Sequence, residues 1–154
     1  MLLSSKKIVQ PASQYPDRHR VEPSEPRSNI TVVFTSVEST VAALKKAGSL
    51  ADSLGARITL VVPQLVPYPL PLDSPPVQSE WNENRLEALA SACPVETSVV
   101  IYLCRDRLRM LKSVLQSGSI VVVGCRNSAR RASDMTLARE LQDLGHVVML
   151  IKAE

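Results

Sequence analysis

Hydrophobic and polar positions alternate between two patterns along residues 29–154. The first apolar run, Ile30 to Thr35, is almost unbroken and rich in β-branched residues. Continuous apolarity over this length is typical of a strand that is covered on both faces. In the stretch that follows, up to Leu54, apolar residues recur at steps of three and four. This spacing predicts an amphipathic helix, with Ser39 available as its cap and Gly55 ending it.

The same alternation continues to the end of the chain. The predicted strands are 30–35, 57–62, 97–104, 119–123 and 146–152, and the helices after the first are 79–93, 106–116 and 133–144. We expect Gly55, Gly118 and Gly145 to close three of the helices, and the helix 79–93 stops before Pro94. Strands and helices that alternate with short links favour an α/β fold of three layers, a doubly wound parallel sheet of five strands with helices on both faces.

Residues 1–28 have a different composition. They contain four prolines among serine, glutamine, arginine and glutamate, with too little apolar surface to offset the entropy of ordering. Of the formal net charge of +3, this segment carries +2. The sequence therefore predicts a disordered Pro-rich arm over 1–28 and one domain over 29–154.

Composition argues against several classes of function. Aromatic residues make up 3% of the chain and no concentrated basic face is evident, so we expect no nucleic-acid partner. The three cysteines are far apart and have no histidine at ligand spacing, so we expect no metal. No apolar stretch approaches the roughly 20 residues of a membrane span, and a cytoplasmic, reducing setting follows as an expectation. No catalytic motif is recognisable, so an enzyme is not expected.

Two segments carry a resemblance to a known family. Val33 to Thr40 at the first strand-helix turn, and Ile120 to Gly124 at the close of the fourth strand, resemble the universal stress protein family over residues 29–154. The resemblance implies a Rossmann-like sheet of the adenine nucleotide alpha hydrolase-like kind, with strand order 3-2-1-4-5. It also implies homodimers built through the last strand, here residues 146–152.

Members of that family that bind ATP place an Asp at the end of strand one, a Val at the end of strand two and a glycine-rich loop after strand four. The corresponding positions here are Thr35, Val62 and Gly124, and no further glycine occurs between Gly124 and Ser133. Glycines in such loops allow main-chain amides to approach phosphates. The sequence therefore predicts little or no ATP binding and no cofactor.

An alternative is that basic side chains replace the glycine-rich loop. Arg126, Arg130 and Arg131 lie beside the start of the last helix, and Ser133 as N-cap would leave amides free for an anion. In this alternative the chain binds an adenine nucleotide, ATP or AMP, through Thr35, Val62, Gly124, Arg126, Arg130 and Ser133. The competing interpretation is that the arginines are solvated surface charges and that Ser133 is a helix cap and nothing more.

The leading hypothesis is a non-enzymatic module that resembles a universal stress protein and acts in stress response or regulation by protein association. Its apolar last strand, 146–152, should lie at a sheet edge, where pairing with a second copy removes an aggregation hazard. A further protein partner could contact the Pro-rich segment 63–78 or the N-terminal arm. For the segment 63–78, a loop that folds back over the sheet is the simpler interpretation.

Overall fold

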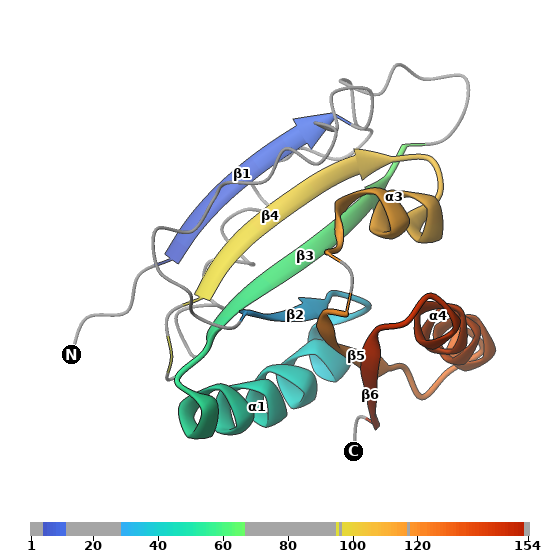
Figure 1. Cartoon of the computed structure of the whole chain (residues 1–154). Coiled ribbons are helices and arrows are strands. Elements are labelled where there is room, and N and C mark those ends of the chain that lie inside the picture. Colours follow the sequence, from blue (N-terminus) through green and yellow to red (C-terminus); the bar gives the residue numbers. More distant parts are fainter. Residues whose placement is uncertain (1–4, 12–28, 67–94, 96, 117, 153–154) are drawn as a thin grey trace.

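The computed structural model describes residues 5–11, 29–66, 95, 97–116 and 118–152, with the main chain alone for 5–11. These residues form a parallel sheet in the order β1-β4-β3-β2-β5-β6, with helices between the strands (Figure 1). The elements are β1 (Ser5–Pro11), β2 (Asn29–Val33), α1 (Val37–Leu54), β3 (Arg57–Leu65), β4 (Thr97–Cys104), α3 (Arg107–Val114), β5 (Ile120–Cys125), α4 (Arg131–Asp143) and β6 (Val147–Lys152).

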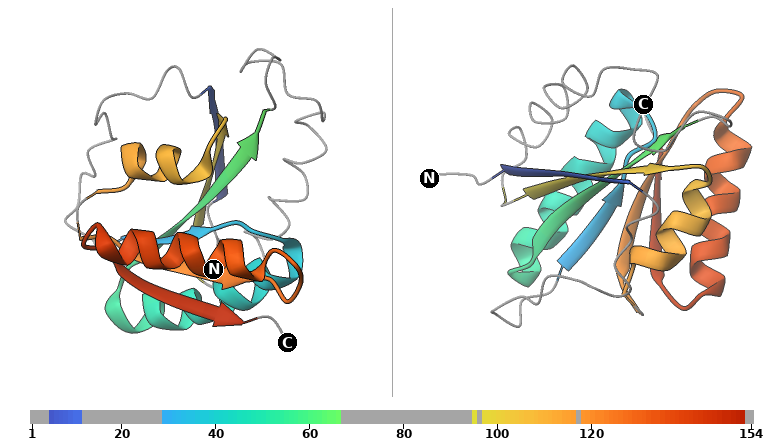
Figure 2. Two further views of the ribbon diagram at one scale, coloured as in Figure 1. Left: turned by 90° about the vertical axis from the view of Figure 1, so that its right-hand side faces the viewer. Right: turned by 90° about the horizontal axis from the view of Figure 1, so that it is seen from above.

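The predicted fold class is confirmed. Counted from β2 onward, the strands follow the order 3-2-1-4-5, and every pair among them is parallel. Helix α1 covers one face of the sheet, and α3 and α4 cover the other (Figure 2). The reversal of strand order at β2 places its neighbours β3 and β5 on opposite sides, so the carboxyl ends of β2 and β5 define the switch point where such sheets bind ligands.

A separate apolar core lies on each face. On the α1 side, Ile30, Leu60 and Ile101 are buried in one cluster with residues of the helix, whose small residues allow close packing. On the other side, Leu111 of α3 and Leu141 of α4 pack on alternate residues of the same strands. Because both faces are covered, the central strands are apolar at nearly every position, which explains the continuous runs in the sequence.

The N-terminal segment differs from the prediction of an arm without regular structure. Ser5–Pro11 form strand β1, which pairs in parallel with β4, with Ser5 opposite Thr97 and Pro11 opposite Leu103. Without β1, the amide and carbonyl groups on the outer edge of β4 would have no partner strand among the described residues. Residues 12–28, the predicted helix 79–93 and all of the Pro-rich segment beyond residue 66 lie outside the described residues.

The helix boundaries partly follow the predictions. Gly55 closes α1 with a φ of 66°, as expected, but α1 begins three residues earlier than predicted because Ser36, not Ser39, is its N-cap. Helix α3 ends at Val114, well before Gly118, so the predicted closure there is wrong. Helix α4 begins at Arg131.

At Gly124, β5 approaches the main chain of α1 very closely. A Cβ atom added to Gly124 would overlap the main-chain carbonyl of Ser39, far inside van der Waals contact. Ser39 is itself fully buried in the first turn of α1. The absence of a side chain at Gly124 therefore allows the start of α1 to lie directly against the end of β5.

This contact leads to a prediction. Gly124→Ala should lower the free energy of unfolding by at least about 2 kcal/mol, because the main chain of α1 has to move away from β5. Urea denaturation followed by circular dichroism measures the change. The control is Ala129→Ser, which also adds one heavy atom but on an exposed part of the next loop, and should stay within about 0.5 kcal/mol of the wild type. Equal stability of wild type and Gly124→Ala would contradict the close-approach argument.

Candidate functional site at the carboxyl edge of the sheet

Thr35 and Gly124 meet at the switch point, as the sequence predicts, but they bind each other. The Thr35 hydroxyl donates to the carbonyl oxygen of Gly124 at 2.5 Å and lies 2.7 Å from the Ser39 hydroxyl. The Thr35 amide donates to Thr40 Oγ1 at 3.2 Å. The Ser36 hydroxyl is 2.6 Å from that of Ser39. These contacts use the polar groups at the ends of β2 and β5 to join the strands to the first turn of α1.

Val62 does not lie at a strand end. Strand β3 continues to Leu65, and Val62 pairs in register with Ile101 of β4. Its side chain is buried in the core on the α1 side. The position therefore serves packing, and the predicted boundary at Val62 is wrong because β4 offers pairing partners for three more residues.

Arg126 is engaged by a buried carboxylate. Asp134, with 0% of its side chain exposed, accepts hydrogen bonds from Arg126 Nε at 2.9 Å, from Arg126 Nη2 at 2.6 Å and from the Arg126 main-chain amide at 2.9 Å. Arg107 Nη2 donates to the same carboxylate at 3.1 Å. One carboxylate thus joins the loop after β5, the first turn of α4 and the start of α3.

The electrostatics of this cluster follow from its contacts. Burial by itself raises the pKa of Asp134, but hydrogen bonds from Arg126 and Arg107 outweigh burial and hold the pKa below its usual value. The hydrogen bonds and charge of Asp134 in turn raise the pKa of Arg126. Much of the positive charge of Arg126 is therefore balanced inside the protein.

Sequence reasoning selected Arg126 but missed Asp134 and Arg107. The available signal was an acidic residue in the first turn of a predicted helix that follows an arginine-rich loop. Arg107 is 27 positions from Asp134, and its approach depends on how α3 and α4 pack on the same face of the sheet. No pattern in the local sequence marks such a contact.

Arg130 and Ser133 take other roles than those predicted. Arg130 is the exposed N-cap of α4, and its main-chain amide donates to Ser128 Oγ at 3.2 Å. Ser133 is not the cap but lies in the first helical turn, where its hydroxyl accepts from Arg107 Nη2 at 3.0 Å. The structure thus brings Arg126 and Ser133 together through Arg107 and Asp134, while the side chain of Arg130 is exposed.

The described residues offer little for thiol or metal chemistry. Cys104 and Cys125 are free and buried. Burial, together with the charge of Asp106, raises the pKa of the Cys104 thiol to about 11, so this thiol is protonated at neutral pH. No group of three or more histidine, cysteine or carboxylate side chains that could hold a metal occurs in the part of the chain described by the structure.

Comparisons with known proteins add no assignment. No protein-family model matches the chain, and no curated protein matches it. No helix among the described residues is long and apolar enough to cross a membrane. The function therefore has to be argued from the geometry of the fold and its surface.

The Asp134 cluster leads to a second prediction. Asp134→Asn should lower the free energy of unfolding at neutral pH by about 3 kcal/mol, because two largely buried guanidinium groups lose their counter-charge. Folding lowers the pKa of Asp134, so its stabilisation is complete above the unfolded-state value of about 3.9 and is lost as the pH falls through the lower folded-state value. The difference between wild type and variant should therefore be constant near neutral pH and shrink below about pH 4.

Urea titrations at a series of pH values measure this difference. Asp52→Asn, at an exposed carboxylate of α1, is the matched control and should change stability by less than about 0.5 kcal/mol. A difference between wild type and Asp134→Asn that does not depend on pH would exclude the proposed electrostatic origin.

Proposed function

We propose that this chain is a non-enzymatic α/β module that works by association and forms a homodimer through the outer edge of β6. The observation that carries the proposal is the apolar, exposed character of this edge. Val147 is 59% exposed, Leu150 is 36% exposed, and Leu144 at the turn before the strand is 47% exposed. By strand alternation Val147 lies on the α1 side of β6 and Leu150 on the α4 side, so apolar surface is exposed on both faces of this edge strand.

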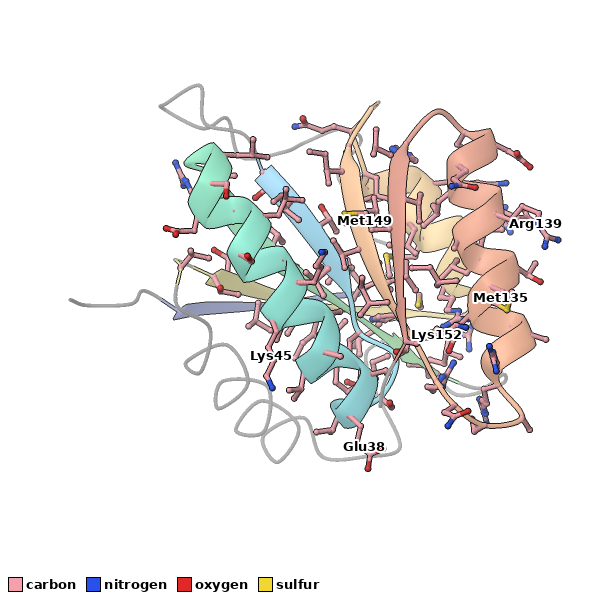
Figure 3. All side chains as sticks on the ribbon, turned by 90° about the horizontal axis from the view of Figure 1, so that it is seen from below. Glu38, Lys45, Met135, Arg139, Met149 and Lys152 are labelled. Carbon is pink, nitrogen blue, oxygen red and sulfur yellow. The ribbon has the colours of Figure 1, made fainter. Side chains whose placement is uncertain are left out.

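Strand β6 pairs with β5 on its inner side and ends the sheet order on its outer side. The side chains of β6 alternate between the two cores. Met149 and Ile151 pack on the α1 side, and Val148 packs on the α4 side. Figure 3 shows β6 between these two helices, with Met149 and Lys152 labelled along it. A strand added at this edge would thus extend both cores as well as the ladder of main-chain hydrogen bonds.

The sequence of β6 has none of the usual devices that protect an edge. Residues 147–151 contain no proline or charged side chain, and Lys152 at the end is the one charge of the strand. Two copies of the same edge can pair antiparallel about a two-fold axis, which makes the patch self-complementary and closes the assembly at two. A second copy is therefore the partner that this edge fits.

The hydrogen bond between Thr35 and Gly124 at the switch point supports a role without tight nucleotide binding. Two donors that a phosphate could use at the end of β5 are already bound inside the protein, because the Thr35 hydroxyl donates to the Gly124 carbonyl and Arg126 donates to Asp134. The layout of the sheet agrees with the resemblance to universal stress proteins, and we extend the proposal to regulation or stress response in the cytoplasm. Further contacts through the segment 63–78 or the N-terminal arm belong to the same hypothesis.

Association through β6 is tested by charge substitution. The wild type should sediment as a dimer at tens of micromolar in analytical ultracentrifugation. Leu150→Lys should shift it to monomer, with a dissociation constant raised by about a hundredfold, since a charge would be buried against the second copy. Circular dichroism checks that the variant remains folded.

Leu65→Lys is the matched control, because Leu65 is 52% exposed at the end of β3, three strands away from β6. It should leave the dimer intact. A wild type that is monomeric at these concentrations, or a Leu150→Lys variant that dimerises as tightly as the wild type, would refute the proposed interface.

Nucleotide binding provides a separate test. Titration calorimetry with ATP and AMP should give no saturable heat at millimolar ligand, because the Thr35 hydroxyl is already bound to the Gly124 carbonyl and Arg126 to Asp134. Saturable ATP binding that perturbs the main chain of Thr35 and Gly124 would favour the alternative of an adenine-nucleotide binding protein.

A further inference from the structure

Strand β1 is joined to the sheet through β4. Ser5–Pro11 pair in parallel with residues 97–103, and β1 ends the sheet on the side opposite β6. The described helices pack on other strands: α1 on β2, β3, β5 and β6, α4 on β5 and β6, and α3 on β3 and β4. Figure 1 shows β1 at the outer margin, with α1 and α4 toward the other side of the sheet. Among the described residues, the main-chain ladder with β4 is therefore what holds β1 in place.

The path of the chain gives β1 an attachment of its own. β1 and β2 follow each other in the sequence, but β4 and β3 lie between them in the sheet. Because the strands are parallel, residues 12–28 have to return from the carboxyl end of β1 to the amino end of β2, a path of roughly 30 Å. Their covalent length can span about 60 Å. The connection is therefore longer than the path requires and does not by itself fix β1 at the edge.

The edge of β4 under β1 is competent to pair with an extended segment. Thr97–Cys104 contains no proline and no charged residue, and its register with both neighbouring strands is unbroken. A sheet edge that is permanently protected usually carries a proline, a charge or a bulge in the edge strand itself. Since β4 has none of these, the protection of its outer edge depends on β1.

The composition of β1 makes its pairing only weakly favourable. The strand contains two adjacent lysines, a glutamine and a terminal proline, with Ile8 and Val9 as its apolar residues. Ladder hydrogen bonds at an edge replace hydrogen bonds to water, and they have to offset the entropy of ordering the segment. Edge segments of this kind open locally without global unfolding. We therefore expect β1 to leave β4 far more often than the inner strands separate.

We propose that the outer edge of β4 is a docking site for an extended segment of a partner protein, and that residues 5–11 are its built-in occupant, which the partner displaces. The register of β1 defines the ligand as a segment parallel to β4, with β-branched residues opposite Val100 and Ile101. Main-chain hydrogen bonds supply affinity in this mode of recognition. The occupant sets a threshold, because a tethered segment competes at an effective concentration of about millimolar.

Hydrogen exchange on the full-length, ¹⁵N-labelled protein tests whether β1 opens. In a parallel ladder, successive amides of β4 point alternately to β1 and to β3. The amides that point to β1 should exchange at least about tenfold faster than those that point to β3, so that protection alternates along residues 97–103. Equal protection of the two sets would show that β1 is a fixed strand and would overturn the proposal.

Docking is tested with a synthetic peptide of residues 1–12, titrated into two full-length variants and followed by the amide shifts of β4. The variants are Lys6→Pro/Ile8→Pro and Lys7→Pro/Val9→Pro. Because main-chain groups alternate in direction, one variant removes two amides that bind β4, and the other removes two that point outward, where proline is tolerated. The first should bind the peptide at least about tenfold more tightly than the wild type does, since the competing strand is released. The second is the matched control and should bind as the wild type does.

A peptide with Ile8→Pro/Val9→Pro is the negative control, since adjacent prolines block either alignment of the ladder. Circular dichroism checks that both protein variants remain folded. Equal affinity of the two variants for the peptide, or no saturable shifts in either at millimolar peptide, would contradict the docking site. Larger oligomers of the released variant would assign the edge to a second copy and would equally refute a partner segment. The dimerisation test through Leu150 uses the opposite edge of the sheet, so either proposal can fail alone.

Discussion

The close approach of α1 to β5 at Gly124 is the constraint on which the rest of the structure depends. It brings the Ser39 main chain against β5, and this places the Thr35 and Ser39 hydroxyl groups within hydrogen-bond distance of each other. The polar groups at the switch point are then satisfied inside the protein. In a Rossmann-like sheet this position is the usual place for a ligand, so the same contact that fixes the helix also reduces the space and the free donors for one.

The sequence predicted the central sheet well because its signal is local. Strands covered on both faces require apolar residues at nearly every position, and β5 has that character throughout and β4 from Val99 onward. The edge strand β1 was not predicted, because Ser5–Pro11 contains two lysines and becomes a strand through pairing with β4, more than eighty positions away. The cap of α1 was misplaced for a different reason: Ser36 and Ser39 are both good capping residues, and sequence alone does not rank them.

The candidate site shows the same division between local and distant signals. Gly124 was selected because it corresponds to the glycine after strand four in the family that the sequence resembles, and its role in packing α1 needed coordinates. Asp134 was missed because its burial depends on Arg126 and Arg107, which reach it from different elements. An arginine cluster in a loop can bind an anion from solution, or it can balance carboxylates inside the protein. The position of one carboxylate decides between these two roles.

Here that carboxylate divides the basic residues into two groups with different tasks. Arg107 and Arg126 balance Asp134 and join α3, α4 and the loop after β5, so their charge stabilises the fold. Arg131 and Lys152 face a hollow whose wall has no carboxylate among the described residues, and Arg130 adds to the positive end of α4. Arg130 and Arg131 by themselves disfavour the start of α4. Asp134 in the same first turn supplies the negative charge that a helix N-terminus favours, so the buried carboxylate also offsets the charge of these two arginines.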